Sequence, residues 1–296
     1  MNATATPAGA WLQAARPATL TVAISAVMVG AAASSHAGVL RFDALAAALI
    51  SATLIQIGTN FANDVFDAEK GADTSARIGP VRVVQAGLLS AGAVKAAMVI
   101  TFALAALAGV YLVWSAGWPI VVIGLASIAS GIAYTGGPWP LGYHGLGDAF
   151  VFAFFGPVAV CGTAFVATGG VPAEAMLASV SVGALATAVL VVNNVRDHGT
   201  DRVAGKRTVV VRFGRTFGVW EYRALLIAAY AVPVSMAVWR HALVLLLPLI
   251  TLPFAMRLSK TLRDEASGPK LNEALASTAK LLLAFSVLFS AALYFR

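Results

Sequence analysis

Charged residues are scarce in this sequence: Asp, Glu, Lys and Arg make up only 11% of the 296 residues, whereas 59% are hydrophobic. Soluble domains carry about a quarter charged residues, so this scarcity argues against a soluble globular protein. Cysteine is scarcer still, because Cys161 is the only one. A single cysteine excludes an intramolecular disulfide framework. We therefore expect an integral membrane protein.

Apolar stretches long enough to cross a bilayer recur along the whole chain. They predict an all-α bundle of nine transmembrane helices around a central cavity, with a polar cap on the cytoplasmic side. We expect one domain, residues 1–296. The expected spans are 18–36, 43–63, 92–113, 117–135, 149–168, 176–195, 222–240, 242–258 and 276–295.

The basic residues predict how the chain is oriented. If the N-terminus is cytoplasmic, every Lys and Arg lies on the inside except Arg41, Arg240 and Arg296. This asymmetry predicts a chain in contact with membrane lipid, with its N-terminus in the cytoplasm and its C-terminus outside. The net charge of +7 is then a sign of topology. No nucleic-acid partner is expected, because the basic residues flank spans instead of forming a basic domain.

Most of the acidic residues that come after an expected span lie in two polar segments, residues 60–91 and 193–221. The strings "NDVFD" (63–67) and "NNVRD" (193–197) begin them, at an offset of 130 residues that indicates two related halves. Each set of polar residues falls on one stripe of a helix. The first stripe is Asn60, Asn63, Asp64 and Asp67, and the second is Asn193, Asn194, Asp197 and Asp201.

Such stripes have two interpretations. The simpler one is a solvated helix end. Against it, clustered carboxylates repel one another, and Asp64 and Asp67 have no cation four residues further on. Carboxylate and amide oxygens without cysteine or paired histidine suit Mg²⁺, which substrate phosphates usually help to coordinate. Interleaved basic residues would bind those phosphates; they are Lys70, Arg77, Arg82, Lys206, Arg207 and Arg212.

A diphosphate at a membrane surface suggests a substrate with a hydrophobic tail. The tail would lie among the helices and the diphosphate at the metal. Metal and basic side chains would stabilise the departing diphosphate, and an electron-rich aromatic ring would capture an allylic carbocation.

At these residues the chain resembles the UbiA-type membrane aromatic prenyltransferases. The resemblance extends through "ARPATL" (15–20), "NDVFDAEKGAD" (63–73), "AYTGGPWPLGYHGLGD" (133–148) and "NNVRDHGTDRVAGKRTVVVRFG" (193–214). Within this superfamily the chain is most similar to the branch that prenylates 1,4-dihydroxy-2-naphthoate. The implied cofactor is Mg²⁺, and the implied substrates are a polyprenyl diphosphate and the naphthoate. The implied location is the bacterial cytoplasmic (inner) membrane. Prenylation with loss of CO₂ and diphosphate would give demethylmenaquinone or its quinol.

The resemblance also implies roles for individual residues. The implied catalytic residues are Asp64, Asp67, Asp197, Asp201 and Tyr134. The implied metal ligands are Asn63, Asp64, Asp67, Asp73, Asn193, Asp197 and Asp201. The implied diphosphate-binding residues are Asn60, Lys70, Arg77, Arg82, Asn194, Lys206 and Arg207.

The sequence departs from the superfamily pattern at two positions. The usual Asp eight residues after Asn63 is replaced by Gly71, and the acid follows as Asp73. Relatives that use 4-hydroxybenzoate carry a Lys four residues after the tyrosine of the fourth span, where this chain has Pro138 after Tyr134. Tyr134 itself has two interpretations, as an interfacial tyrosine or as a group that orients a substrate.

Two other functions are compatible with the sequence. The first is prenyl transfer to another acceptor, such as 4-hydroxybenzoate or homogentisate. The second is secondary transport, which the two related halves would suit. A transporter should place ionisable residues near the middle of the bilayer, and here no expected span has an acid at its centre.

Overall fold

The computed structural model describes residues 6–72, 79–265 and 268–296, and its regular secondary structure in these ranges is entirely helical. The elements are α1 (Pro7–Ala15), α2 (Pro17–Ala33), α3 (Phe42–Glu69), α4 (Ala91–Ala116), α5 (Pro119–Ala133), the 3₁₀ helix η1 (Leu141–His144), α6 (Gly147–Ala153), the π-helix η2 (Phe154–Cys161), α7 (Gly162–Thr168), α8 (Ala173–Val203), α9 (Val209–Phe213), α10 (Arg215–Arg240), the 3₁₀ helix η3 (Leu243–Thr251), α11 (Leu252–Asp264) and α12 (Pro269–Tyr294).

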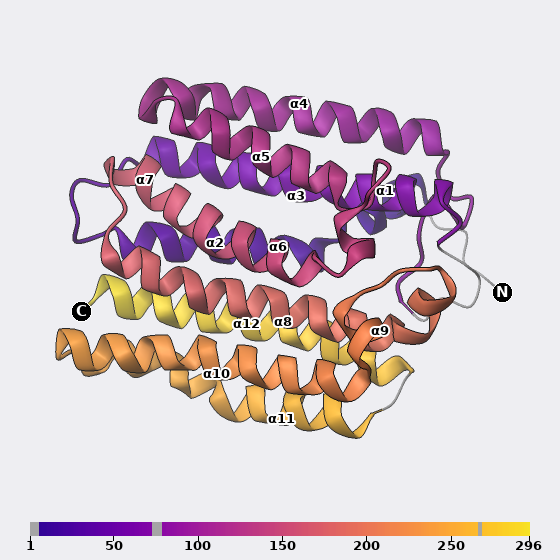
Figure 1. Cartoon of the computed structure of the whole chain (residues 1–296). Helices are drawn as coiled ribbons and strands as arrows, with labels where there is room; N and C mark the ends of the chain where they lie inside the picture. Colours follow the sequence, from indigo (N-terminus) through magenta and orange to yellow (C-terminus); the bar gives the residue numbers. More distant parts are fainter. Residues whose placement is uncertain (1–5, 73–78, 266–267) are drawn as a thin grey trace.

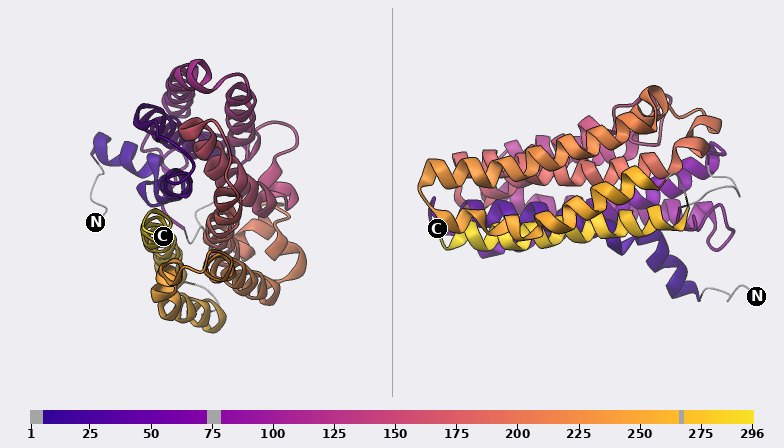
Figure 2. Two further views of the ribbon diagram at one scale, coloured as in Figure 1. Left: turned by 90° about the vertical axis from the view of Figure 1, so that its left-hand side faces the viewer. Right: turned by 90° about the horizontal axis from the view of Figure 1, so that it is seen from below.

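The long helices run roughly along one axis and form an elongated bundle (Figures 1 and 2). Helix α8 lies at its centre, where it packs against α10, α12 and the π-helix η2. The largest group of buried apolar side chains surrounds α8, whereas α3 and α4 pack together on another side. This arrangement confirms the all-helical fold class.

By length and composition together, fewer of the described helices qualify as membrane spans than the nine expected. Within the described residues seven helices are long and apolar enough to cross a membrane, or eight if α1 and α2, which meet at 43°, form one span. Helix α5 has only 15 residues, which is short of the usual span length. Every segment expected as a span is helical, but the count of nine is not confirmed.

The segment expected as a regular span at 149–168 is interrupted by the π-helix η2. Pro157 lies inside it and has no backbone N–H to donate, so the α-helical hydrogen-bond ladder cannot continue unchanged. Gly156 allows the π-helix to approach α8 closely. A Cβ atom at Gly156 would lie 2.6 Å from the backbone oxygen of Ser179 and 3.0 Å from the Cα of Gly183.

Helices α3 and α8 carry the two acidic motifs. They have 28 and 31 residues, so each continues as a helix beyond the span expected for it. The carboxyl ends of both lie at the right-hand end of the bundle in Figure 1. The fold thus brings two segments that are 130 residues apart in the sequence to the same end of the molecule.

Candidate active site

A cavity of about 960 Å³ runs into the bundle from this end. Its deeper walls are apolar and include Phe150, Phe154 and Val166. Polar side chains from both acidic motifs line its other end; they are Asn60, Asn63, Asp67, Asn193, Asn194, Asp197 and Asp201. The cavity therefore combines an apolar chamber with a charged mouth.

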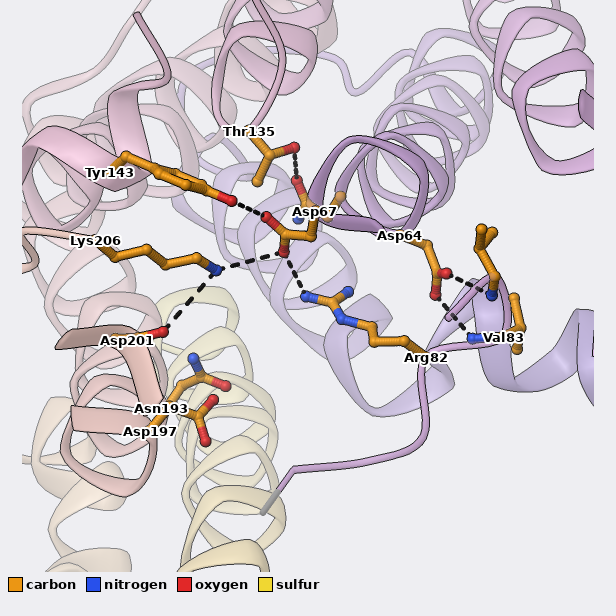
Figure 3. A network of polar contacts seen from close by, with 12 residues as sticks. Asp64, Asp67, Arg82, Val83, Thr135, Tyr143, Asn193, Asp197, Asp201 and Lys206 are labelled. Carbon is orange, nitrogen blue, oxygen red and sulfur yellow. Dashed lines mark hydrogen bonds and ion pairs between the residues drawn. The ribbon is translucent and has the colours of Figure 1, made fainter. Parts of the chain in front are cut away.

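Asp67 is the best-connected acid of the first motif (Figure 3). Its Oδ1 accepts a hydrogen bond of 2.7 Å from the hydroxyl of Tyr143. Its Oδ2 accepts one of 3.0 Å from Nη2 of Arg82 and lies 3.5 Å from Nζ of Lys206. Two cations and a hydroxyl therefore stabilise this carboxylate, and all three come from outside α3.

Lys206 joins the two motifs. Its Nζ lies 3.5 Å from Oδ2 of Asp67 and 3.9 Å from Oδ1 of Asp201, which belongs to α8 (Figure 3). Two carboxylates that share one ammonium group are close enough to act on the same ligand. The structure thus brings the two acidic motifs together at one site.

The acids of both motifs are buried. The exposed fraction is 1% for Asp64 and Asp67, 3% for Asp197 and 9% for Asp201. Carboxylates are almost never buried to this degree unless they are paired or hydrogen-bonded. The interpretation of these stripes as solvated helix ends is therefore wrong.

Asp64 lies next to Asp67 in the motif but has different partners. Its Oδ2 and Oδ1 accept hydrogen bonds of 3.3 and 3.0 Å from the backbone N–H groups of Val83 and Val84. Figure 3 shows its carboxylate pointing away from Asp67, and Asp64 is not among the residues that line the cavity. It fixes the segment that begins with Arg82.

The second motif contains its own cation. Nε and Nη2 of Arg196 donate hydrogen bonds of 2.8 and 2.6 Å to Oδ1 and Oδ2 of Asp197. Arg196 also donates to the side-chain oxygens of Asn193, at 2.7 Å, and Asn272 of α12, at 3.1 Å. Arg196 is buried, so this fork of hydrogen bonds fixes the orientation of Asp197 and Asn193 together.

Several residues predicted from the sequence have mainly structural contacts. Asn60 donates to the backbone oxygen of Ala15 at 2.8 Å, and thereby ties α3 to α1. Asn194 donates to Oδ1 of Asp148 at 3.4 Å. Asn63 accepts a hydrogen bond of 2.9 Å from Thr135, and all three asparagines also line the cavity.

The predicted phosphate-binding cations are divided between the cavity and the surface. Arg82 and Lys206 line the cavity, whereas Lys70, Arg207 and Arg212 do not. The side chain of Arg207 is exposed, and Arg212 donates to the backbone oxygens of Arg207 and His144. The predicted residues Asp73 and Arg77 lie outside the described part of the chain.

Lys70 lies just beyond α3, beside the site. Its Nζ donates to the backbone oxygen of Thr135 at 2.6 Å. Burial lowers the pKa of the Lys70 amine, the charge of Lys206 acts in the same direction, and Asp67 opposes both. Tyr134 lines the cavity wall nearby, as a tyrosine that orients a substrate would have to.

Two residues of the site were not predicted. The sequence assigns no site role to Arg196, which counts only among the basic residues that indicate topology, or to Tyr143, which lies within the stretch "AYTGGPWPLGYHGLGD". The position of Arg196 inside "NNVRD" was a usable signal, because a cation within an acidic motif needs a partner. No spacing rule could have found Tyr143, because its contact with Asp67 joins residues 76 positions apart.

The donor set fits a hard divalent cation that substrate oxygens help to hold. In the ranges that the structure describes, no three His, Cys, Asp or Glu residues gather tightly enough to hold a metal alone. Asp67 and Asp201 nevertheless lie within reach of one ammonium group, and the amide side chains of Asn63 and Asn193 line the same cavity. Mg²⁺ is commonly bound by one or two carboxylates plus substrate phosphates, which is the arrangement that this site offers.

Comparison with known proteins gives consistent results. The model of the UbiA prenyltransferase family matches residues 23–281. A 1,4-dihydroxy-2-naphthoate octaprenyltransferase from Mycobacterium tuberculosis is 38% identical over 293 residues, 96% of this chain and 97% of the relative. An Escherichia coli protein of the same name is 43% identical over 213 residues, 69% of this chain and 68% of the relative.

Solved structures show the same fold. A UbiA homologue from Archaeoglobus fulgidus, bound to DMAPP and Mg²⁺, superposes with a TM-score of 0.63 at 14% identity, covering 95% of this chain and 99% of the homologue. The family match, the full-length sequence relative and this fold agree with the site geometry. The chain therefore belongs to the UbiA prenyltransferase family, which confirms the expectation of an integral membrane prenyltransferase.

Proposed function

We propose that this protein transfers a polyprenyl group from polyprenyl diphosphate to 1,4-dihydroxy-2-naphthoate, with Mg²⁺ as cofactor. The allylic C–O bond of the donor breaks, and diphosphate leaves with the bonding electrons. A ring carbon of the acceptor bonds to the allylic carbon, and the acceptor loses its carboxylate as CO₂. The direct product of these redox-neutral steps is the quinol, demethylmenaquinol, and demethylmenaquinone forms from it only when a separate oxidant removes two electrons.

One observation carries this proposal. Asp67 of the first motif and Asp201 of the second contact the same ammonium group of Lys206, at the mouth of a largely apolar cavity of about 960 Å³. A charged mouth suits a diphosphate, and an apolar chamber suits a prenyl tail. A substrate that carries both groups fits the cavity as a whole.

In this proposal the side chains that line the cavity mouth have two different roles. Asn63, Asp67, Asn193, Asp197 and Asp201 hold Mg²⁺, while Arg82 and Lys206 bind the diphosphate oxygens. When bound, Mg²⁺ supplies positive charge that stabilises the departing diphosphate. Asp64 positions the segment that carries Arg82, because its carboxylate accepts from the backbone N–H groups of Val83 and Val84.

Two findings support the naphthoate as acceptor. The full-length relative from Mycobacterium tuberculosis carries this acceptor in its name, as does the relative from Escherichia coli. The chain also has Pro138 where hydroxybenzoate enzymes carry Lys. Prenylation of 4-hydroxybenzoate or homogentisate is the alternative within the same family.

The test is a product assay with purified protein in detergent. It is given 1,4-dihydroxy-2-naphthoate and prenyl diphosphates of several lengths, and the products are identified by mass spectrometry. We expect a prenylated, decarboxylated product that disappears in excess EDTA and returns with Mg²⁺. Product formed undiminished in EDTA would contradict the proposed role of the metal. Product formed only with hydroxybenzoate or homogentisate would show that one of these, and not the naphthoate, is the acceptor.

The same preparation separates the enzyme from a transporter. Reconstituted into liposomes, a transporter would move a solute without forming a covalent product. We expect covalent product and no such flux, because the motif acids lie in the last turns of α3 and α8, whose carboxyl ends are at one end of the bundle (Figure 1).

We also propose the orientation and the span count predicted from the sequence. The acidic mouth then lies on the cytoplasmic side, and α5 counts as a short span. The excess of basic residues near this mouth supports the orientation.

A further inference from the structure

The turn between α5 and α6 crosses the mouth of the cavity. Within it, the 3₁₀ helix η1 (Leu141–His144) places Tyr143 on the cavity wall. The backbone of this turn is attached to the segment that follows the second motif. The N–H of Arg207 donates to the backbone oxygen of Tyr143 at 2.8 Å, and Nη2 of Arg212 donates to that of His144 at 2.7 Å.

The side chain of Tyr143 reaches across to the first motif. Its hydroxyl donates a hydrogen bond of 2.7 Å to Oδ1 of Asp67 (Figure 3). Arg82 and Lys206 both contact the other oxygen, Oδ2. The hydroxyl therefore determines which way the plane of this carboxylate faces.

The ring of Tyr143 contacts the two lysines beside the site. Nζ of Lys206 lies 4.9 Å from the ring centroid and Nζ of Lys70 lies 5.1 Å from it. An aromatic face attracts ammonium groups at such distances. The two ammonium groups repel each other, and their shared attraction to the ring offsets part of that repulsion.

We propose that Tyr143 is a positioning residue for the metal and diphosphate site. Its hydroxyl orients the Asp67 carboxylate, and its ring holds the ammonium groups of Lys70 and Lys206 where they face an incoming diphosphate. This inference rests on the proposed function. It adds a group from outside both acidic motifs, which makes the binding of Mg²⁺ depend on the turn that covers the mouth.

Two variants separate the hydroxyl from the ring. Tyr143→Phe removes only the donor to Asp67, whereas Tyr143→Leu removes the ring as well. Tyr111→Phe is the matched control, because the hydroxyl of Tyr111 also donates to an aspartate, Asp43, and neither residue lines the cavity.

The test uses two binding measurements that do not depend on turnover. The first is the Mg²⁺ concentration that gives half-maximal thermal stabilisation at a fixed concentration of farnesyl diphosphate, without acceptor. The second is the affinity for farnesyl diphosphate in EDTA, measured by calorimetry. For Tyr143→Phe we expect the Mg²⁺ concentration to rise roughly tenfold, as for other groups that orient metal ligands. Its metal-free affinity should stay within about twofold, because the ring remains.

Tyr143→Leu should raise the Mg²⁺ concentration at least as much and should also weaken metal-free binding by roughly fivefold. Tyr111→Phe should change neither value. If Tyr143→Leu does not yield folded protein, Tyr143→Phe decides the question, since it differs from the native chain by one oxygen atom.

The proposal is overturned if Tyr143→Phe has the Mg²⁺ requirement of the unaltered protein. It is also overturned if Tyr143→Phe and Tyr111→Phe shift that requirement equally. If the unaltered protein is not stabilised by Mg²⁺ with farnesyl diphosphate, the proposed function fails first. The two failures are thus distinguishable in one experiment.

Discussion

Asp64 and Asp67 lie one helical turn apart on α3, yet they have different partners. Asp64 accepts from the backbone N–H groups of Val83 and Val84, whereas Asp67 meets Arg82, Lys206 and Tyr143. One acid fixes a polypeptide segment, and the other belongs to a cluster of opposite charges at the cavity mouth. At the scale of single residues, their partners distinguish two acids of the same motif.

This difference predicts unequal effects of the same substitution. Asp67→Asn should lower the rate of prenyl transfer by roughly 100-fold or more, because it removes a charge from a proposed metal ligand. Asp64→Asn should lower it by roughly tenfold or less, because the amide oxygen still accepts one of the two backbone hydrogen bonds. Initial rates at saturating substrates measure both. Equal losses would restore Asp64 as a metal ligand, as the sequence predicted.

Lys206 and Arg207 allow a matched test of the diphosphate site. Lys206→Met should raise the KM for polyprenyl diphosphate roughly tenfold or more, because a charge-assisted contact is lost inside the cavity. Arg207→Met removes the same charge from an exposed side chain outside the cavity. It should change the KM by about threefold or less, since exposed charges interact weakly through water. A large effect of Arg207→Met would mean that its side chain turns inward when the donor binds.

At the scale of whole helices, the close contact between the π-helix η2 and α8 holds one wall of the cavity. A Cβ at Gly156 would lie 2.6 Å from a backbone oxygen of α8. Backbone atoms cannot move aside as the end of a flexible side chain can, so the two helices would have to separate. Phe154 and Phe155, which precede Gly156, line the cavity.

Gly156→Ala should therefore destabilise the fold, whereas Gly92→Ala should not. Gly92 lies in α4, and a Cβ there would meet nothing within 4 Å. Both substitutions add the same methyl group, so the difference in their free energies of unfolding isolates the overpacking, which typically costs about 1–3 kcal/mol. Thermal unfolding in detergent measures this difference. Equal unfolding midpoints for the two variants would show that η2 can move away from α8 at no cost in free energy.

The sequence predicted the elements better than their contacts. Each segment expected as a span is helical, because the length and composition of apolar stretches determine where a chain crosses a bilayer. The π-helix at Phe154–Cys161 was not predicted, since it depends on how Pro157 and Gly156 pack against α8. The motifs identified the acids, but the orientation of Asp64 is set by a segment 19 residues away. Tyr143 belongs to the site because it contacts Asp67, which is far away in the sequence, and no local sequence pattern predicts such a contact.

At the scale of the whole molecule, the site lies at one end of an elongated bundle (Figure 1). Helix α8 runs toward this end and finishes at Val203. The turn between α2 and α3, which contains Val39, and the turn after α10, which precedes Leu243, lie at the opposite end. These three side chains are exposed, at 85%, 89% and 81%. The proposed orientation places Val203 in the cytoplasm and the other two outside.

Cysteine labelling tests this orientation directly, because Cys161 is the only native cysteine. In a Cys161→Ser background, Val39→Cys and Leu243→Cys should react with a membrane-impermeant maleimide in right-side-out vesicles. Val203→Cys should react only after the vesicles are permeabilised, since the positive-inside distribution keeps the basic end of the bundle in the cytoplasm. The reverse pattern would place the diphosphate site on the outer face, away from the side where the basic residues predict it.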